Sequence, residues 1–233
     1  MKSLILTDNP KTLSFAKELD RMYGNVDIYQ SPDGPLPHVP ELDLKSYPTA
    51  IIGQYKLILS IHCKQLFPAE LLSSIRCVNV HPGYNPFNRG WFPHVFSIVN
   101  GLKTGVTIHE MDEQLDHGAI IAREEYILKS WDTSASAYAN ILKIERKLLL
   151  KHFISIRDGE YQTISPEAEG NINYRNDYEK LKFLNLDRRG TFKEFLSQLR
   201  ALSHGELKNA YFHDENGKRV FVRVVLEPEE PLI

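Results

Sequence analysis

The feature that most constrains the fold is the alternation of short apolar runs with helix-like stretches over about the first 160 residues. The runs have the length and composition of strands covered on both faces, and they lie at residues 4–7, 50–52, 57–61 and 78–80. Helical spacing of apolar side chains occurs at residues 13–19 and 69–75. We therefore predict a Rossmann-like α/β fold, a mainly parallel sheet with helices on both faces and its ligand site beyond the carboxyl ends of the strands.

The next part of the chain carries signals for two more strands and a long helix. Residues 105–111 alternate between apolar and polar side chains, and residues 119–122 form another apolar segment after a turn-like sequence. Asp132 or Thr133 can then cap a long amphipathic helix. We expect these elements to complete a main domain of residues 1–164.

The remaining residues, 165–233, favour a small separate α+β unit. Composition becomes more polar from Ser165 onward, and a capping box at residues 191–194 predicts a helix. Two strand-like runs flank a strong turn signal at residues 214–217, which predicts a β-hairpin. A hairpin of this size is not stable alone, so it must pack on its own domain or on a second subunit.

Composition argues against several classes of partner and location. The formal net charge of −2 provides no broad basic field, which disfavours nucleic acid as a partner. The two cysteines, Cys63 and Cys77, form no paired motif, which suits a reducing compartment. The short apolar run at the amino terminus is too brief for a signal peptide, and no later run approaches membrane-spanning length. We expect a cytoplasmic protein without a membrane partner.

The strand at residues 77–81 ends in polar side chains that suggest acyl-transfer chemistry. Period-two geometry places Asn79 and His81 on one face. An amide can donate to a developing oxyanion while an imidazole handles the proton of an attacking amine. Asp116, in a turn-like segment, could orient the imidazole. A structural histidine and a turn-stabilising aspartate explain the same residues equally simply, so the residues alone support only a site hypothesis.

Four fragments, in this order, resemble the signature of the folate-dependent formyltransferase family: Asn79-x-His81-Pro82, Arg89-Gly90, residues 105–109, and Leu115-Asp116-x-Gly118. The resemblance covers most of residues 50–125. It implies that Asn79 stabilises the oxyanion, His81 transfers the proton and Asp116 orients His81. It also implies a catalytic role for the main domain.

The resemblance further implies the formyl donor, 10-formyltetrahydrofolate, and direct attack by a substrate amine without a metal or a covalent enzyme intermediate. The family holds the pterin of the donor mainly through backbone groups. In this chain the corresponding residues are Ile61, His62, Cys63 and Lys64 together with Met111 and Asp112.

The segment after the His-Pro motif bears on the amine acceptor. Relatives that act on initiator tRNA or glycinamide ribonucleotide continue with a Ser-Leu-Leu-Pro-like sequence, whereas residues 83–91 read Gly-Tyr-Asn-Pro-Phe-Asn-Arg-Gly-Trp. This variant resembles the enzymes that formylate dTDP-linked amino dideoxy sugars for surface polysaccharides such as O-antigen in lipopolysaccharide. The expected acceptor is dTDP-4-amino-4,6-dideoxyglucose, and the small C-terminal unit is expected to form a homodimer through its hairpin.

Five residues are candidates for contact with this acceptor. Arg89 and Asn9 could bind a pyrophosphate, while Tyr84, Trp91 and Phe92 could pack against the sugar or the base. Ordinary loop packing and a structural salt bridge remain open for the same residues.

Two other classes, and another amine as acceptor, stay open from the sequence. A metal-dependent hydrolase could use ligands among His81, His94, His109, Asp116 and His117, but the chain has no H-E-x-x-H motif or compact ligand cluster. A non-catalytic module that binds sugar nucleotides is possible if the three polar residues only line a pocket.

Overall fold

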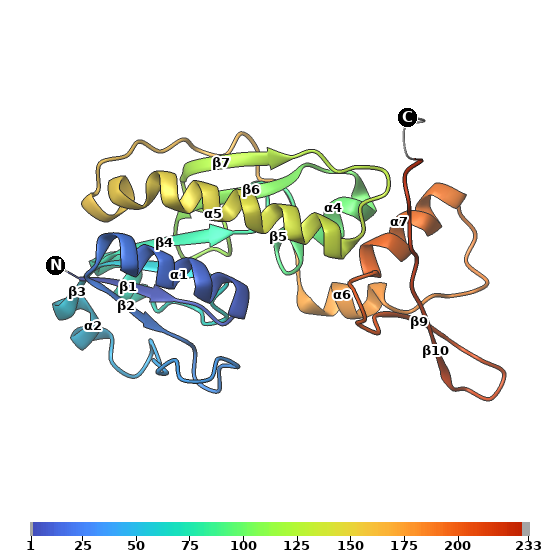
Figure 1. Cartoon of the computed structure of the whole chain (residues 1–233), viewed down its shortest axis with the longest axis horizontal. Helices are drawn as coiled ribbons and strands as arrows, with labels where there is room; N and C mark the ends of the chain where they lie inside the picture. The colour runs from blue at the N-terminus through green and yellow to red at the C-terminus, as the bar shows by residue number, and fades with distance from the viewer. Residues whose placement is uncertain (1, 230–233) are drawn as a thin grey trace.

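The computed structural model describes residues 2–229, so residues 1 and 230–233 at the outer ends of the two expected domains lie outside the described residues. The main feature is a six-stranded sheet in the order β2-β1-β3-β4-β6-β7 (Figure 1). Its strands are β1 (Lys2–Leu6), β2 (Val26–Tyr29), β3 (Tyr55–Ile61), β4 (Arg76–His81), β6 (Thr104–Glu110) and β7 (Ile120–Tyr126). The first four are parallel, and β6 runs antiparallel to both β4 and β7. The predicted α/β fold with a mainly parallel sheet is confirmed.

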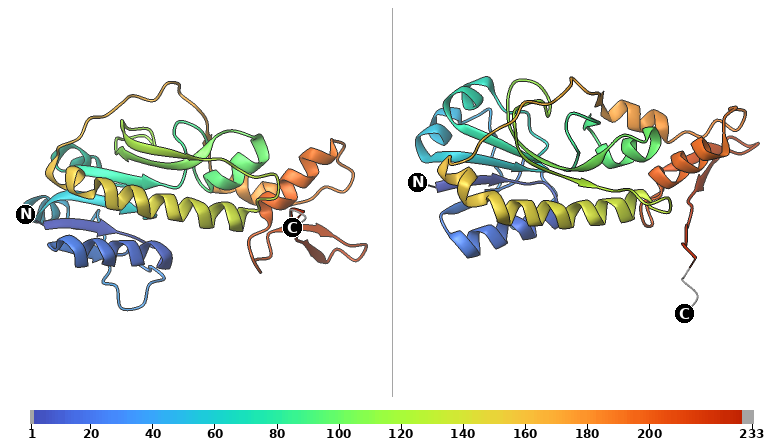
Figure 2. Two further views of the ribbon diagram at one scale, coloured as in Figure 1. Left: turned by 45° about the horizontal axis from the view of Figure 1, so that its top comes forward. Right: turned by 90° about the horizontal axis from the view of Figure 1, so that it is seen from above.

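Helices cover both faces of this sheet because successive strand residues point to opposite sides. Ile5 packs with α1 (Pro10–Tyr23) and α5 (Ser134–Asp158), whereas Leu4 and Leu6 pack with α2 (Pro48–Gln54) and α3 (Ala69–Ser74). Figure 2 shows α1 and α5 side by side on the first of these faces. The long helix α5 begins after a Thr133 cap, as predicted, and ends at Gly159.

One strand prediction was wrong, and one strand of the six-stranded sheet was missed. Residues 50–52, predicted as a strand, lie within α2, which starts with Pro48 at its first turn and buries Ile51. An apolar run of this length fits a strand and a buried helical turn equally well. The missed strand is β2, an edge strand whose polar Asp27 interrupts the apolar pattern.

The C-terminal part forms a small unit at one end of the sheet (Figure 1). It contains α6 (Arg175–Leu181), α7 (Phe192–Leu202) and the antiparallel hairpin of β9 (Ala210–His213) and β10 (Arg219–Val222). The predicted capping box between Thr191 and Glu194 and the predicted hairpin are confirmed. Buried apolar side chains of this unit pack against α4 (Pro93–Asn100) and the first turn of α5.

A short pair of strands joins this unit to the loop after β4. The segment β5 (Arg89–Gly90) pairs in parallel with β8 (Ile172–Asn173), which precedes α6. Asn88 is fully buried beside this pair, and its side-chain oxygen accepts hydrogen bonds from Asn100, Asn171 and Asn173. The chain leading into the C-terminal unit therefore fixes the loop that follows His81.

Within residues 2–229 no helix has the combination of length and apolar composition that crossing a membrane requires.

Candidate active site

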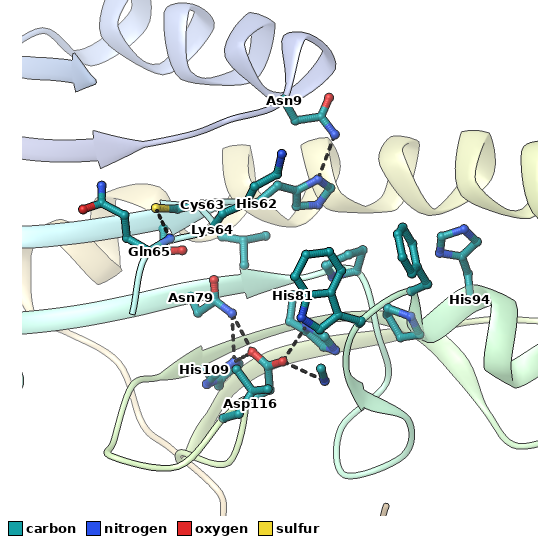
Figure 3. A pocket seen from close by; sticks show the side chains of 18 of the residues that line it. Asn9, His62, Cys63, Lys64, Gln65, Asn79, His81, His94, His109 and Asp116 are labelled. Carbon is teal, nitrogen blue, oxygen red and sulfur yellow. Dashed lines mark hydrogen bonds and ion pairs between the residues drawn. The ribbon is translucent and has the colours of Figure 1, made fainter. Parts of the chain in front are cut away.

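A cavity of about 700 Å³ lies at the carboxyl ends of β3 and β4, where the fold class predicts a ligand site. Val78 and Val80 pack in the core on the α1–α5 side of the sheet, so the alternate residues Asn79 and His81 face the other way. Both line the cavity, together with Asp116. The structure therefore brings the three predicted catalytic residues together (Figure 3).

The carboxylate of Asp116 contacts both other side chains. Asn79 Nδ2 donates to Asp116 Oδ1 at 2.9 Å, and His81 Nδ1 lies 3.3 Å from Asp116 Oδ2. His81 Nε2 is buried and has no hydrogen-bond partner within the described chain. The carboxylate thus holds one side of the imidazole, and the other nitrogen is available to a bound substrate.

Backbone geometry fixes Asp116 itself. Its φ of +49° lies in the left-handed region, which only some residues occupy readily, aspartate among them. The Gly90 amide donates to Asp116 Oδ2 at 3.0 Å, and the Asn85 side chain donates to the Asp116 carbonyl at 2.8 Å. The carboxylate is therefore held by the same β5 segment that pairs with β8.

Burial and charge set the protonation states of this pair. Burial lowers the pKa of His81 to about 4, although the Asp116 charge opposes this shift. Burial acts to raise the pKa of Asp116, but the neighbouring His81 and His109 and the hydrogen bond from Gly90 outweigh it and hold that pKa well below its usual range. At neutral pH the pair is accordingly a carboxylate and a neutral imidazole, which is the state of a general base.

His109 is a further site residue for which the sequence suggested only a metal-ligand role. It pairs with Asn79 across β4 and β6, and its Nε2 lies 3.4 Å from Asn79 Nδ2. Its Nδ1 lies 2.6 Å from the Glu110 carbonyl, so Nδ1 carries a proton, and its Nε2 also lies 3.5 Å from Asp116 Oδ1. The alternation of residues 105–111 could have identified His109 as a site residue, because it places His109 on the face opposite the buried Val106 and Ile108.

The predicted folate segments line one arm of the cavity. His62, Cys63, Lys64, Met111 and Asp112 contribute to its wall, along with the apolar side chains of Leu66, Phe67, Leu72 and Leu115. The loop after β3 is anchored by Asp8, which accepts from the Lys64 amide at 2.7 Å. Ile61 packs in the core and does not line the cavity.

The predicted acceptor contacts divide into two groups. Asn9, Trp91 and Phe92 line the cavity. Arg89 is instead buried with its Nη2 donating to Glu169 at 2.8 Å, and Tyr84 lies under Arg123, whose guanidinium carbon is 4.6 Å from the ring centroid. The cavity lining includes neither Arg89 nor Tyr84, because protein groups already occupy their polar or aromatic surfaces.

Several further residues line the cavity that the sequence did not suggest as substrate contacts, although His94 was considered as a metal ligand. They come from α4, α5 and the C-terminal unit, and they include His94, Ser134, Tyr138, Tyr178, His204 and Asn209. Among residues 2–229, no three His, Cys, Asp or Glu side chains are grouped so as to hold a metal ion.

This fold and site define a class of protein, an α/β enzyme whose imidazole, amide and carboxylate suit transfer to an amine. The family model described as formyl transferase matches residues 51–153, and the model described as N-formyltransferase dimerization C-terminal domain matches residues 177–228. The chain is 56% identical over 231 residues, 99% of each chain, to a dTDP-4-amino-4,6-dideoxyglucose formyltransferase from Mycobacterium bovis. The chain therefore belongs to the formyl transferase family and is a formyltransferase, which confirms the resemblance noted in the sequence.

Solved structures agree with this assignment. A 4-N formyltransferase from Francisella tularensis is 40% identical, with a TM-score of 0.92 over 98% of both chains. The formyltransferase PseJ from Anoxybacillus kamchatkensis is 27% identical, with a TM-score of 0.63 over 77% of this chain and 89% of that one. The PseJ structure is a complex with UDP-4,6-dideoxy-4-formamido-L-AltNAc and tetrahydrofolate.

Proposed function

We propose that this protein transfers a formyl group from 10-formyltetrahydrofolate to the amino group of dTDP-4-amino-4,6-dideoxyglucose. The observation that carries the proposal is His81, a buried neutral base that Asp116 holds at Nδ1 and whose free Nε2 lines the cavity. The full-length similarity to a formyltransferase of that name supports the choice of acceptor.

Each of the three residues has one task in this reaction. His81 Nε2 takes the proton of the amine as its nitrogen bonds to the formyl carbon, and returns a proton to the nitrogen that leaves. Asn79 has one Nδ2 proton on Asp116 and only a long contact to His109, so its second proton is available to the formyl oxygen as negative charge develops there. Asp116 orients the ring and stabilises the imidazolium that forms transiently.

The cavity suits two ligands that meet at His81. Its volume lies within the range of about 300–1,000 Å³ usual for small-molecule sites. Figure 3 shows Cys63, Lys64 and Gln65 on one side of His81 and His94 on the other. The first arm, with its backbone groups and apolar side chains, suits a pterin, and the second arm, with aromatic rings beside amide and hydroxyl groups, suits a sugar nucleotide. The PseJ complex, which holds a nucleotide-linked sugar and a folate together, supports this division.

The domain division, the assembly and the location are part of the same proposal. Residues 1–164 act as the catalytic domain, and the C-terminal unit from residue 165 onward joins two copies through the hairpin, where Phe221 is 40% exposed. The match to a dimerization domain supports the homodimer. A cytoplasmic location is consistent with the free thiols of Cys63 and Cys77.

The test is mass spectrometry of dTDP-, UDP- and GDP-linked amino sugars after incubation with the protein and 10-formyltetrahydrofolate. We expect a formyl gain on the dTDP-linked 4-amino sugar that depends on folate and is abolished by His81→Ala. A gain on a different sugar would overturn the acceptor, and a gain that persists in His81→Ala would overturn the mechanism. No gain on any sugar, with binding retained, would favour a binding module.

A further inference from the structure

A second polar cluster lies in the wall of the cavity, away from Asp116. It joins the start of α1, the end of β3 and the buried face of α5 through Asn9, His62, Tyr138 and Glu145. His62 Nε2 lies 2.9 Å from Glu145 Oε1, and Glu145 is 0% exposed. On the other side of the ring, His62 Nδ1 lies 3.2 Å from Asn9 Nδ2 (Figure 3). A fully buried carboxylate is costly to maintain unless it is paired, and the partner of Glu145 here is the His62 imidazole.

The hydrogen bonds around Asn9 determine the tautomer of His62. Asn9 Oδ1 accepts from the Lys11 amide at 2.9 Å as the cap of α1, so the other end of the side chain is the NH₂ group. That NH₂ group donates to His62 Nδ1, which must therefore be unprotonated. The ring proton then resides on Nε2, which lies 2.9 Å from Glu145 Oε1.

The same hydrogen bonds leave one donor proton of Asn9 and Tyr138 without a partner. Asn9 Nδ2 donates to Tyr138 Oη at 2.7 Å, and both Asn9 Nδ2 and Tyr138 Oη lie near His62 Nδ1, at 3.2 and 3.3 Å, where a single lone pair accepts one proton. Burial raises the pKa of Tyr138 to about 12, so the hydroxyl keeps its proton at neutral pH. Tyr138 and Asn9 both line the cavity, and the remaining proton can be donated to a ligand there.

An independent observation marks the same wall as a ligand surface. The ring of His94 stacks on Tyr138 with centroids 5.1 Å apart, and both rings line the cavity. His94 is only 6% exposed, yet its Nδ1 has no hydrogen-bond partner within the described chain. A buried polar atom of this kind is normally satisfied, so this unpaired nitrogen marks the wall as a place where a further polar partner fits.

We propose that Glu145 and His62 are positioning residues for the acceptor: by fixing the His62 tautomer they orient Asn9 and Tyr138 to bind the nucleotide-linked amino sugar. This inference rests on the proposed function. The ligand groups it implies are hydroxyl or phosphoryl oxygens, which accept from Tyr138 or Asn9. His62 belongs to the predicted folate segment, but Tyr138 stacks with His94, which Figure 3 shows on the side of His81 away from Cys63, Lys64 and Gln65, so the acceptor is the expected ligand of this wall.

The experiment separates acceptor binding from folding and from chemistry. Steady-state kinetics would be measured for wild type, Glu145→Leu, Glu145→Gln, His62→Phe and the double variant of Glu145→Leu with His62→Phe. The control is Asp132→Asn, which removes another buried carboxylate near the start of α5 that does not line the cavity. Nitrogen chemical shifts of His62 in the wild type would report its tautomer even if a variant fails to fold.

We expect Glu145→Leu and His62→Phe each to raise KM for the sugar nucleotide about tenfold, the effect of losing one well-placed hydrogen bond to a ligand. In Glu145→Leu, whose residue does not line the cavity, kcat and KM for the folate should stay within about twofold, because Asn79, His81 and Asp116 are untouched. Glu145→Gln keeps an acceptor for the Nε2 proton and should behave like wild type. The double variant should be no worse than either single variant, since the two residues act as one unit.

Several outcomes would overturn the inference. A purely structural role would lower the active fraction, and hence kcat, in Glu145→Leu without changing KM. A rise in KM for the folate in Glu145→Leu would assign the wall to the donor. A His62 proton on Nδ1 would directly refute the proposed hydrogen bond from Asn9 or Tyr138 to that nitrogen. Failure of the proposed function is distinguishable, because the wild type would then show neither turnover nor binding of the sugar nucleotide, whatever the His62 tautomer.

Discussion

Replacing Asp116 with asparagine should reduce kcat by about 10³- to 10⁴-fold. The carboxylate oxygen lies 3.3 Å from His81 Nδ1, and an imidazolium forms transiently as the amine loses its proton. Coulomb's law at this distance gives about 5 kcal/mol at an effective dielectric constant of about 20. Loss of that stabilisation corresponds to between three and four powers of ten in rate, taking about 1.4 kcal/mol for each.

Orientation adds to the effect of charge. Asp116 uses one oxygen to accept from Asn79 and the other to face His81 and the Gly90 amide. An asparagine has one oxygen, so its NH₂ group must face one of these partners. If it faces His81, the ring is driven toward the tautomer with its proton on Nε2, which cannot accept a proton from the amine.

The assay is single-turnover formyl transfer with both substrates saturating, followed by rapid quenching and mass spectrometry. Thermal melting and substrate affinities of Asp116→Asn would show whether the variant is folded and binds normally. A folded variant whose rate falls less than tenfold would refute the role of this carboxylate in the chemical step.

Three further predictions concern stability, pH and assembly. Gly90→Ala should lose about 1–3 kcal/mol of unfolding free energy and at least tenfold in kcat, because φ at Gly90 is +87° and a Cβ would overlap the Asn173 carbonyl. Gly101→Ala is the control, because φ at Gly101 is +72° but the space around it is open, and it should lose only about 1 kcal/mol. Urea titration of both variants would measure these losses. Burial lowers the pKa of His81 to about 4 and of His94 to about 3, so both side chains bind a proton more readily in the unfolded chain than in the folded one. The stability of the folded state that is present above about pH 6.5 is therefore lost as the pH falls. Each histidine should lower the free energy of unfolding by about 2 kcal/mol between pH 6.5 and 5. An unchanged urea midpoint over that range would contradict the burial argument. Phe221→Glu on the hairpin should shift the mass measured by light scattering from dimer to monomer, whereas Lys218→Glu at the turn should not.

Local pattern was sufficient for part of the site. The run that ends at His81 is a buried strand, and period-two geometry alone placed Asn79 and His81 on one face. Asp116 lies 37 residues beyond Asn79, in a loop with a left-handed backbone, so no local pattern could bring it to the pair. Its assignment depended on the resemblance to a family.

Competition between protein groups explains why Arg89 and Tyr84 lie elsewhere. The chemistry of an arginine and a tyrosine near a His-Pro motif is compatible with a nucleotide ligand, and nothing nearby in the sequence contradicts it. The partner of Arg89 is Glu169, 80 residues away, and the partners of Tyr84 are Arg123 and Lys103. Long-range pairing of this kind depends on how β5 and β8 meet, which the sequence does not reveal.

The wall of α5 carried a signal that the sequence reasoning did not use. The buried stripe of this helix includes Ile141, Leu142, Leu148 and Leu149, and Glu145 occupies the matching position between them. A carboxylate within an apolar stripe must have a partner, because an unpaired buried charge costs several kcal/mol. Glu145 contacts His62, which follows the end of β3, and Tyr138 lies two helical turns further toward the amino end of α5. A misplaced charge on a helix face is therefore evidence for a polar site across the interface, and here it points to the cavity that the catalytic residues share.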